Sequence, residues 1–177
     1  MRTVDTGHSL VLLRHAKAEQ LPPGSPTSDH DRRLTAQGRR DAVAAGSWLR
    51  EHGVVPQLVI CSTSRRTRET WAGAVAGGGH TEFVEYRRTV YAGGIGAVLD
   101  TIREDADEVD TLVVVGHAPT IPALATILAD GRGSTAAHEA LADGFPTTGL
   151  ALLRYGGEWA DLAPGTARLE AFHVCRG

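Results

Sequence analysis

Four short runs of apolar residues stand out along the chain, each rich in Val, Ile and Leu. They occupy residues 10–13, 58–61, 112–115 and 150–153. Apolar residues are continuous within each run and do not alternate with polar ones, which is typical of strands that are buried on both faces. The pattern therefore predicts four strands in a sheet that is covered on two sides.

Helices are predicted between these strands. The clearest covers Ala36–Glu51, with Thr35 as its N-cap and Gly53 just past its end. Three further helices are predicted at residues 64–76, 96–103 and 121–128. Because strands that alternate with helices form βαβ units, the expected fold class is α/β, a three-layer α/β/α sandwich with a mostly parallel central sheet.

The last part of the chain has a different pattern. Residues 150–155, the pair at 156–157 (Gly-Gly) and residues 158–163 predict an antiparallel hairpin that closes one edge of the sheet. A Pro- and Ser-rich stretch at 21–28 predicts a loop at the rim of a site. No internal repeat or linker interrupts the sequence, so residues 1–177 are expected to form a single domain.

Composition and charge narrow the classes of function. Apolar residues make up 42% of the chain and charged residues 22%, which excludes a disordered protein. The net charge is −3 and no run of Lys or Arg is present, so neither nucleic acid nor a membrane is an expected partner. The N-terminal apolar run is too short for a signal sequence, and the expected location is cytoplasmic.

Candidate chemistry gathers where three of the predicted strands end. Arg14 and His15 follow the first strand, Arg66 lies just beyond the second, and His117 follows the third. In an open parallel sheet, ligands bind beyond the carboxyl ends of the strands, so these residues are expected to share one crevice. Two arginines and a histidine supply hydrogen-bond donors for a phosphoryl group, and a second, neutral histidine can act as the nucleophile. A helix that begins near Ser64 adds free N–H groups at the same place.

Four motifs in order along the chain resemble those of a known family. They are R-H-A at 14–16, D-R-R-L-T-A-Q-G at 31–38, S-T-S-R-R-T-R-E-T at 62–70 and G-H at 116–117. They are similar to the R-H-G, D-R-P-L-T-x-x-G, S-x-x-x-R-A-x-x-T and G-H motifs of the histidine phosphatase superfamily, which also contains the cofactor-dependent phosphoglycerate mutases. The second motif resembles that of the short, SixA-type phosphohistidine phosphatase branch.

This resemblance implies a phosphoglycerate mutase-like fold and a histidine phosphatase that needs no metal ion or other cofactor. It implies that His15 is the nucleophile and that Arg14, Arg66 and His117 bind the phosphate. Only about seventeen residues, 79–95, are available for a cap, so the pocket is expected to be shallow and open. The expected substrate is a phosphorylated protein with a phosphohistidine domain, or else a small phosphoester, with inorganic phosphate as the product.

The general acid is not identified by the motifs. Many members of the superfamily have a Glu at the position that corresponds to Thr89, and Glu85 and Glu82 are nearby substitutes, although each also fits an exposed position on an edge strand. Phosphohistidine releases an imidazole, which needs less protonation than an alkoxide. The predicted function is therefore dephosphorylation of protein phosphohistidine. The alternatives are a small-molecule phosphomonoesterase of the same superfamily and a non-catalytic phosphate-binding module.

Other phosphatase chemistries find less support. A cysteine phosphatase would need an arginine six residues after Cys61, where Thr67 stands, so Cys61 is expected to be a buried strand residue, and Cys175 a plain thiol. No Asp and His residues have the spacing of a metal site on adjacent strand ends.

The remaining basic residues are expected to have structural or surface roles. Six of them are histidines: His8, His30, His52, His80, His138 and His173. Arg65 and Arg68 are expected at the surface or in ion pairs. Arg32 either orients the loop over the site or pairs with Asp29 or Asp31.

Overall fold

The four apolar runs form the four central strands of a mixed sheet. The structure, a computed structural model, describes residues 7–177. Its strands are β1 (His8–Arg14), β2 (Leu58–Ser62), β3 (Phe83–Arg87), β4 (Thr111–Gly116), β5 (Ala129–Gly133), β6 (Gly149–Tyr155) and β7 (Ala167–Val174). Their order in the sheet is β3-β2-β4-β1-β6-β7-β5. Strands β1 to β4 run parallel, and β6 is antiparallel to both of its neighbours, β1 and β7.

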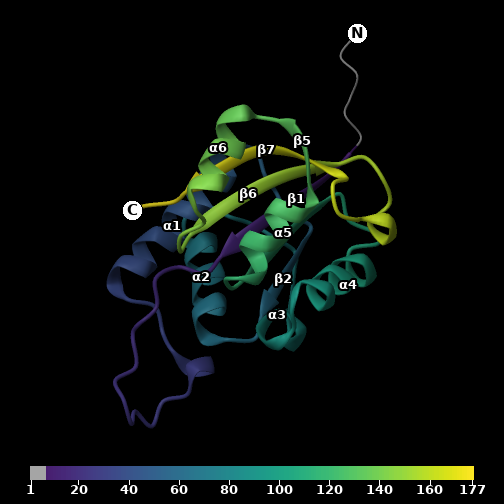
Figure 1. The fold of residues 1–177 in the computed structure, drawn as a ribbon. Helices are drawn as coiled ribbons and strands as arrows, with labels where there is room; N and C mark the ends of the chain where they lie inside the picture. The colour runs from purple at the N-terminus through teal and green to yellow at the C-terminus, as the bar shows by residue number, and fades with distance from the viewer. Residues whose placement is uncertain (1–6) are drawn as a thin grey trace.

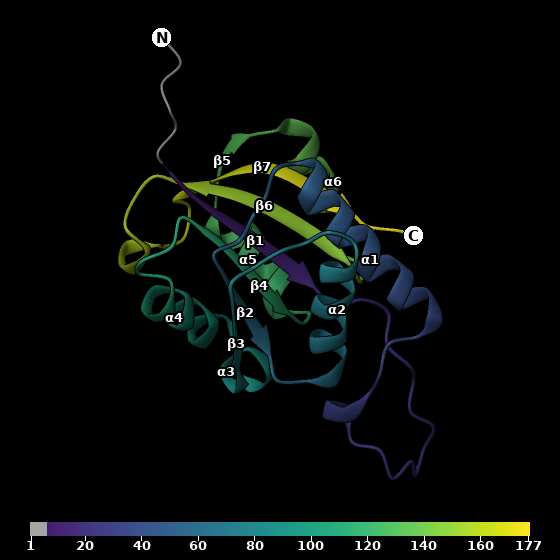
Figure 2. The same cartoon turned by 180° about the vertical axis from the view of Figure 1, so that it is seen from behind.

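Helices cover both faces of this sheet. They are α1 (Ala36–Glu51), α2 (Arg65–Ala76), α3 (Arg88–Ala92), α4 (Ile95–Asp105), α5 (Thr120–Leu128) and α6 (Thr135–Asp143), with short 3-10 turns at Asp29–Asp31 and Trp159–Asp161. Figure 1 shows α4 and α5 on the near side of the sheet, and the reverse view in Figure 2 brings α1 and α2 forward. The predicted three-layer α/β/α sandwich with a mostly parallel sheet is confirmed.

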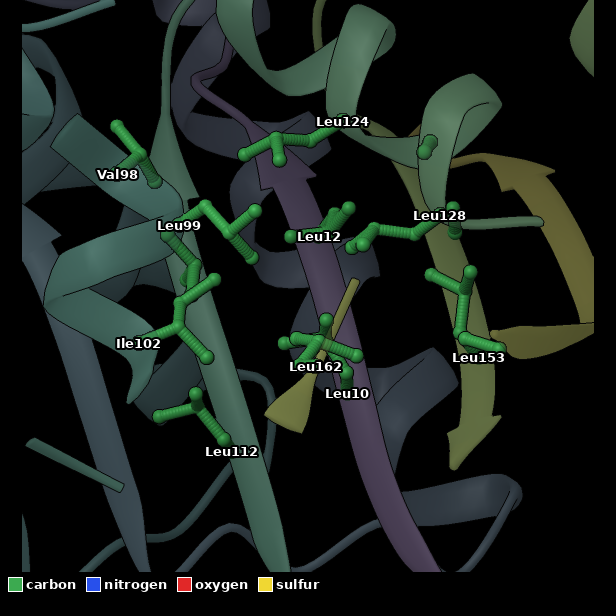
Figure 3. Packing of buried hydrophobic residues seen from close by; sticks show 14 of the residues in the cluster. Leu10, Leu12, Val98, Leu99, Ile102, Leu112, Leu124, Leu128, Leu153 and Leu162 are labelled. Carbon is green, nitrogen blue, oxygen red and sulfur yellow. The ribbon is translucent and has the colours of Figure 1, made fainter. Parts of the chain in front are cut away.

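Two hydrophobic cores explain why the apolar runs are continuous. Leu10 and Leu12 of β1 pack with α4 and α5 in one core, which Figure 3 shows from close by. The residues between and after them, Val11 and Leu13, pack with α1 and α2 in the other. Successive side chains of a strand point to opposite faces, so a strand that is buried on both faces must be apolar throughout.

No helix within residues 7–177 has the length and apolar character that a membrane crossing requires.

Helix α1 begins and ends where the sequence predicted. The side-chain oxygen of Thr35 accepts a hydrogen bond from the backbone amide of Gly38, as an N-cap does. Gly38 also allows α1 to lie close to the segment after β1, since a Cβ atom there would collide with the carbonyl oxygen of Lys17. The spacing between Thr35 and Gly38 in the motif thus places α1 against the segment that follows β1.

The predicted hairpin is only half correct. Residues 149–155 form β6, but residues 158–163 are not a strand, and the antiparallel partner of β6 is β7, Ala167–Val174. The reason is Trp159, whose side chain is buried and whose indole N–H donates to the carbonyl oxygen of Val109, 2.6 Å away. This anchor holds the segment in a 3-10 turn beside α4. The strand β7 also does not close the sheet, because β5 pairs with its outer edge.

Candidate active site

The carboxyl ends of the parallel strands bring the predicted site residues together. Arg14 lies opposite Gly116 in the pairing of β1 with β4, so His15 and His117 emerge side by side. Their ring centroids are 5.2 Å apart. Arg66 lies on the first turn of α2, directly after β2. Both views of the fold show α3 and the long loop before α1 at this end of the sheet (Figures 1 and 2).

His15 is buried, and its ring is neutral at physiological pH. Its Nδ1 atom lies 2.7 Å from the carbonyl oxygen of Ala16. A carbonyl oxygen only accepts hydrogen bonds, so Nδ1 carries the ring proton and Nε2 keeps its lone pair. Burial lowers the pKa of His15 to about 4, assisted by the charges of Arg66 and Arg14, and the bond to Ala16 offsets part of the change. The ring is therefore in the nucleophilic form.

His117 is oriented by a serine of the neighbouring strand. Its Nε2 atom lies 2.7 Å from Oγ of Ser62, and this oxygen accepts a bond from the amide of Ser64 at 3.3 Å. This contact fits a ring that carries its proton on Nδ1, with the Ser62 hydroxyl donating to Nε2. Burial and the charge of Arg66 lower the pKa of His117 to about 3, so the ring is neutral. It presents an N–H donor, not a cation.

Arg14 is fixed by the loop that leads into β6. Its Nη1 atom donates to the carbonyl oxygen of Phe145 at 2.9 Å. In the same loop, the backbone amide of Thr148 lies 3.2 Å from the carbonyl oxygen of Arg14 and 3.1 Å from that of His15. Thr148 has a φ of 58°, in the left-handed region that is unfavourable for a β-branched residue. The turn therefore holds the end of β1 at some cost in backbone energy.

Arg66 is fixed by the long loop that precedes α1. Its Nη1 atom donates to the backbone carbonyl of Asp29 at 2.7 Å, and its Nη2 atom lies 3.1 Å from the Asp29 carboxylate. The side chain of Arg66 is only 8% exposed. The carboxylate of Asp29 also accepts from Tyr91 at 3.0 Å and from Arg32 at 3.0 Å. Of the two partners considered for Arg32, Asp29 is thus the correct one.

Three buried nitrogen atoms of this site have no hydrogen-bond partner within residues 7–177. They are Nε of Arg14, Nε of Arg66 and Nδ1 of His117. A buried donor without a partner costs roughly 1–3 kcal/mol, so native proteins seldom leave several in one place. All three belong to residues that lie near His15, so an anion bound there could accept hydrogen bonds from them. The arrangement can therefore hold a phosphoryl group next to a ring nitrogen that carries a free lone pair.

Thr70 joins two of the sequence motifs. Its hydroxyl oxygen accepts a bond from the backbone amide of Ala16 at 2.9 Å, and its proton is donated to the carbonyl oxygen of Arg66 at 2.6 Å. The side chain is fully buried. The final Thr of the S-x-x-x-R-x-x-x-T pattern thus locks the first turns of α2 to the residue that follows His15.

Comparisons with known proteins agree with this geometry. The model of the histidine phosphatase superfamily (branch 1) matches residues 10–88. The structure named "Putative Phosphohistidine Phosphatase SixA" from Nakamurella multipartitia is 38% identical, covers 96% of both chains and has a TM-score of 0.79. The chain belongs to the histidine phosphatase superfamily. The corresponding SixA structure from Agrobacterium tumefaciens (30% identity, TM-score 0.75, covering 94% of this chain and 97% of that one) agrees with the SixA-type branch.

A third relative carries no assigned activity. It is the uncharacterized protein Rv1276c of Mycobacterium tuberculosis, which is 43% identical over 168 residues that cover 93% of this chain and all of that one. Membership of the histidine phosphatase superfamily supports phosphatase activity and a phosphorylated substrate.

The residues considered as general acids do not reach the site of this superfamily member. Glu82 and Glu85 line a groove with Gln57 and Val109, which precede β2 and β4, at the amino ends of the strands. Glu85 lies in the middle of β3, opposite Ile60 of β2, and its carboxylate pairs with Arg87. The site lies at the opposite, carboxyl ends. Both glutamates are therefore wrong candidates for the proton donor.

The hydroxyl of Thr89, at the position where the family resemblance led us to look for a Glu, is engaged by α4. It lies 2.9 Å from the hydroxyl of Thr101 on that helix. The carboxylate that does lie at the site is Asp29, and sequence reasoning missed its contact with Arg66. From the sequence, Asp29 was considered only as a possible partner of Arg32. Tyr91 and Thr148 were missed as well, since neither belongs to a motif.

The other basic and thiol residues mostly follow expectation. Cys61 is buried, and this burial raises the pKa of its thiol to about 12, which agrees with a structural role. Arg65 pairs with Glu69 at 2.7 Å, and the guanidinium of Arg68 lies over the ring of Tyr86. His30 comes nearer the site than a surface residue would, since its ring packs edge-on against Tyr91.

Proposed function

We propose that the protein is a phosphohistidine phosphatase that removes the phosphoryl group from histidine side chains of other proteins. The observation that carries this proposal is the neutral ring of His15 beside residues that hold three buried nitrogen atoms with no hydrogen-bond partner in residues 7–177. A phosphoryl group offers three oxygens to such donors, and an unprotonated Nε2 can attack its phosphorus atom.

The proposed reaction has two steps. The Nε2 lone pair of His15 forms a bond to phosphorus while the P–N bond to the substrate imidazole breaks, and the released imidazole takes up a proton from solvent. Water then attacks phosphorus, the bond to Nε2 breaks, and inorganic phosphate leaves. Arg14, Arg66 and His117 would bind the three oxygens through both steps, and no metal ion is required.

The nature of the leaving group favours phosphohistidine over an alkyl phosphate. An alkoxide must be protonated as it leaves, whereas an imidazole leaves readily. The carboxyl group beside Arg66 belongs to Asp29, and burial raises its pKa, but hydrogen bonds from Arg32 and Tyr91 outweigh burial and bring the pKa to about 2. Asp29 is therefore ionised at neutral pH and holds no proton to donate. The likeness to proteins named as SixA phosphohistidine phosphatases supports the same substrate.

Substrate preference tests the proposal. Purified protein would be assayed for phosphate release from a phosphohistidine-bearing domain, from a panel of sugar phosphates and from p-nitrophenyl phosphate, with and without a metal chelator. We expect the highest kcat/KM with the phosphohistidine domain and no effect of the chelator. A large preference for sugar phosphates would instead favour a small-molecule phosphomonoesterase, and phosphate binding without turnover would indicate a non-catalytic module.

A further inference from the structure

The guanidinium group of Arg66 is held from one side by a single residue of the loop before α1. Both of its terminal nitrogens contact Asp29, one at the backbone carbonyl (2.7 Å) and one at the carboxylate (3.1 Å). The remaining nitrogen, Nε, is buried and has no partner within residues 7–177. A planar group that is held at two corners has one orientation, so Asp29 decides which edge of Arg66 is left for a ligand.

Asp29 is in turn held in place by two other side chains. Tyr91 donates its hydroxyl to the same carboxylate oxygen that Arg66 contacts, at 3.0 Å, and Arg32 donates to the other oxygen, at 3.0 Å. The ring of Tyr91 packs edge-on against His117, with centroids 5.7 Å apart. The carboxylate of Asp29 therefore joins Arg66 of α2 to Tyr91 of α3. Tyr91 in turn contacts the site residue His117.

We propose that Asp29 is a positioning residue, which fixes the orientation of Arg66 so that its free edge meets the phosphoryl group. This role rests on the proposed function, because it requires that Arg66 binds phosphate. An arginine side chain loses about 2 kcal/mol of rotamer freedom when it is ordered. Contact with Asp29 orders Arg66 before the substrate arrives, so that less of this cost falls on substrate binding.

Two other roles for Asp29 make different predictions. If Asp29 were a proton donor, its removal would slow the hydrolysis of substrates with poor leaving groups and not of those with good ones. If Asp29 only competed with phosphate for Arg66, its removal would strengthen phosphate binding, because a negative charge would leave the site. As a positioning residue, its removal weakens phosphate binding and slows all substrates alike.

The test compares Asp29→Ala and Asp29→Asn with wild type. The matched control is Asp31→Asn, since Asp31 lies on the same 3-10 turn but its carboxylate accepts from Ser28 and not from Arg66. The readouts are the dissociation constant for inorganic phosphate by calorimetry, and kcat and KM for p-nitrophenyl phosphate and for an alkyl phosphate. Thermal unfolding of each variant checks that it folds.

We expect Asp29→Ala to lower kcat/KM by about 10²-fold for both substrates and to weaken phosphate binding in parallel, because misplacement of a binding group is this costly. Asp29→Asn keeps an acceptor oxygen and is expected to lie in between, and Asp31→Asn to stay near wild type. Unchanged or tighter phosphate binding in Asp29→Ala, or a loss confined to the alkyl phosphate, would overturn the inference. If Asp29→Ala does not fold, the same outcomes are read from Asp29→Asn. A wild-type protein that neither binds phosphate nor hydrolyses any substrate would overturn the proposed function itself.

Discussion

The two halves of the candidate site are built in different ways. Arg14 and His15 are held by backbone carbonyl oxygens, those of Phe145 and Ala16. Arg66 also contacts a backbone carbonyl, that of Asp29, but it depends in addition on the Asp29 carboxylate, and His117 depends on the hydroxyl of Ser62. A backbone partner is present whatever the side chain at that position, but a side-chain partner is lost by one substitution. The first half should therefore tolerate changes in its surroundings, and the second half should be sensitive to them.

The largest effect is expected from the loss of the proposed nucleophile. His15→Ala should lower phosphate release by at least about 10⁴-fold and prevent trapping of a radiolabelled phosphoenzyme, since the variant lacks the proposed attacking lone pair. His138→Ala, a histidine beside Arg132 in a part of the chain far from β1, serves as the control and should keep wild-type activity. A phosphoenzyme that still forms in His15→Ala would contradict the assignment.

Replacement of either arginine by lysine tests whether the two halves bind phosphate equally. Arg14→Lys and Arg66→Lys each keep the charge but lose the buried Nε donor, so kcat/KM should fall by about 10²- to 10³-fold in both. The measurement is steady-state kinetics with p-nitrophenyl phosphate. If only one variant is impaired, the phosphoryl group is bound by one half of the site.

Removal of a partner in the second half should have a smaller effect. Ser62→Ala leaves Nε2 of His117 without its partner and allows the ring to carry its proton on the wrong nitrogen. A buried group that loses its partner costs roughly 1–3 kcal/mol, which corresponds to about a fivefold to 150-fold loss in kcat/KM. Ser62→Thr retains the hydroxyl and should recover part of the loss. Equal activity of wild type and Ser62→Ala would show that His117 needs no such orientation.

The smallest effect is expected from pH changes near neutrality. The pKa of His15 is lowered to about 4, so the ring stays neutral between pH 5 and 7, and NMR titration of its ring proton should show a midpoint near 4. A midpoint near the ordinary value of 6.5 would contradict the buried environment.

The lowered pKa of His15 also affects stability. In the unfolded chain, the His15 ring binds a proton as the pH falls through 6.5, whereas in the folded protein it stays neutral down to about pH 4. The free energy of unfolding should therefore decrease as the pH falls from above 6.5 to 4. Urea unfolding at several pH values measures this change.

The central strands and α1 were predictable because each rests on a local rule. Continuous apolar residues such as those around Leu12 are required where both faces are buried, and the Thr35 cap fixes the start of a helix. The segment around Trp159 met the strand rule and still folded otherwise, because a long-range bond to Val109 outweighed local preference. Such a bond depends on the position of a distant loop and leaves no periodic pattern.

The candidate site shows the same division. His15, His117 and the two arginines were predictable because motifs placed them at strand ends, and the structure brings them together. Asp29 and Tyr91 come from a loop and a short helix, whose contacts are decided by how the backbone folds over the site. Loop residues without a repeating pattern give the sequence reader no reason to pair them with a given arginine.

The left-handed backbone of Thr148 has a consequence for engineering. A residue without a Cβ branch would adopt a φ of 58° more easily, so Thr148→Gly or Thr148→Asn is a natural first choice for a more heat-resistant protein. Yet this threonine sits against the carbonyl groups of Arg14 and His15, and its buried hydroxyl is without a partner in the described part of the chain. Both substitutions keep the backbone amide that bonds to these carbonyl groups, so what they change is the buried hydroxyl beside the end of β1.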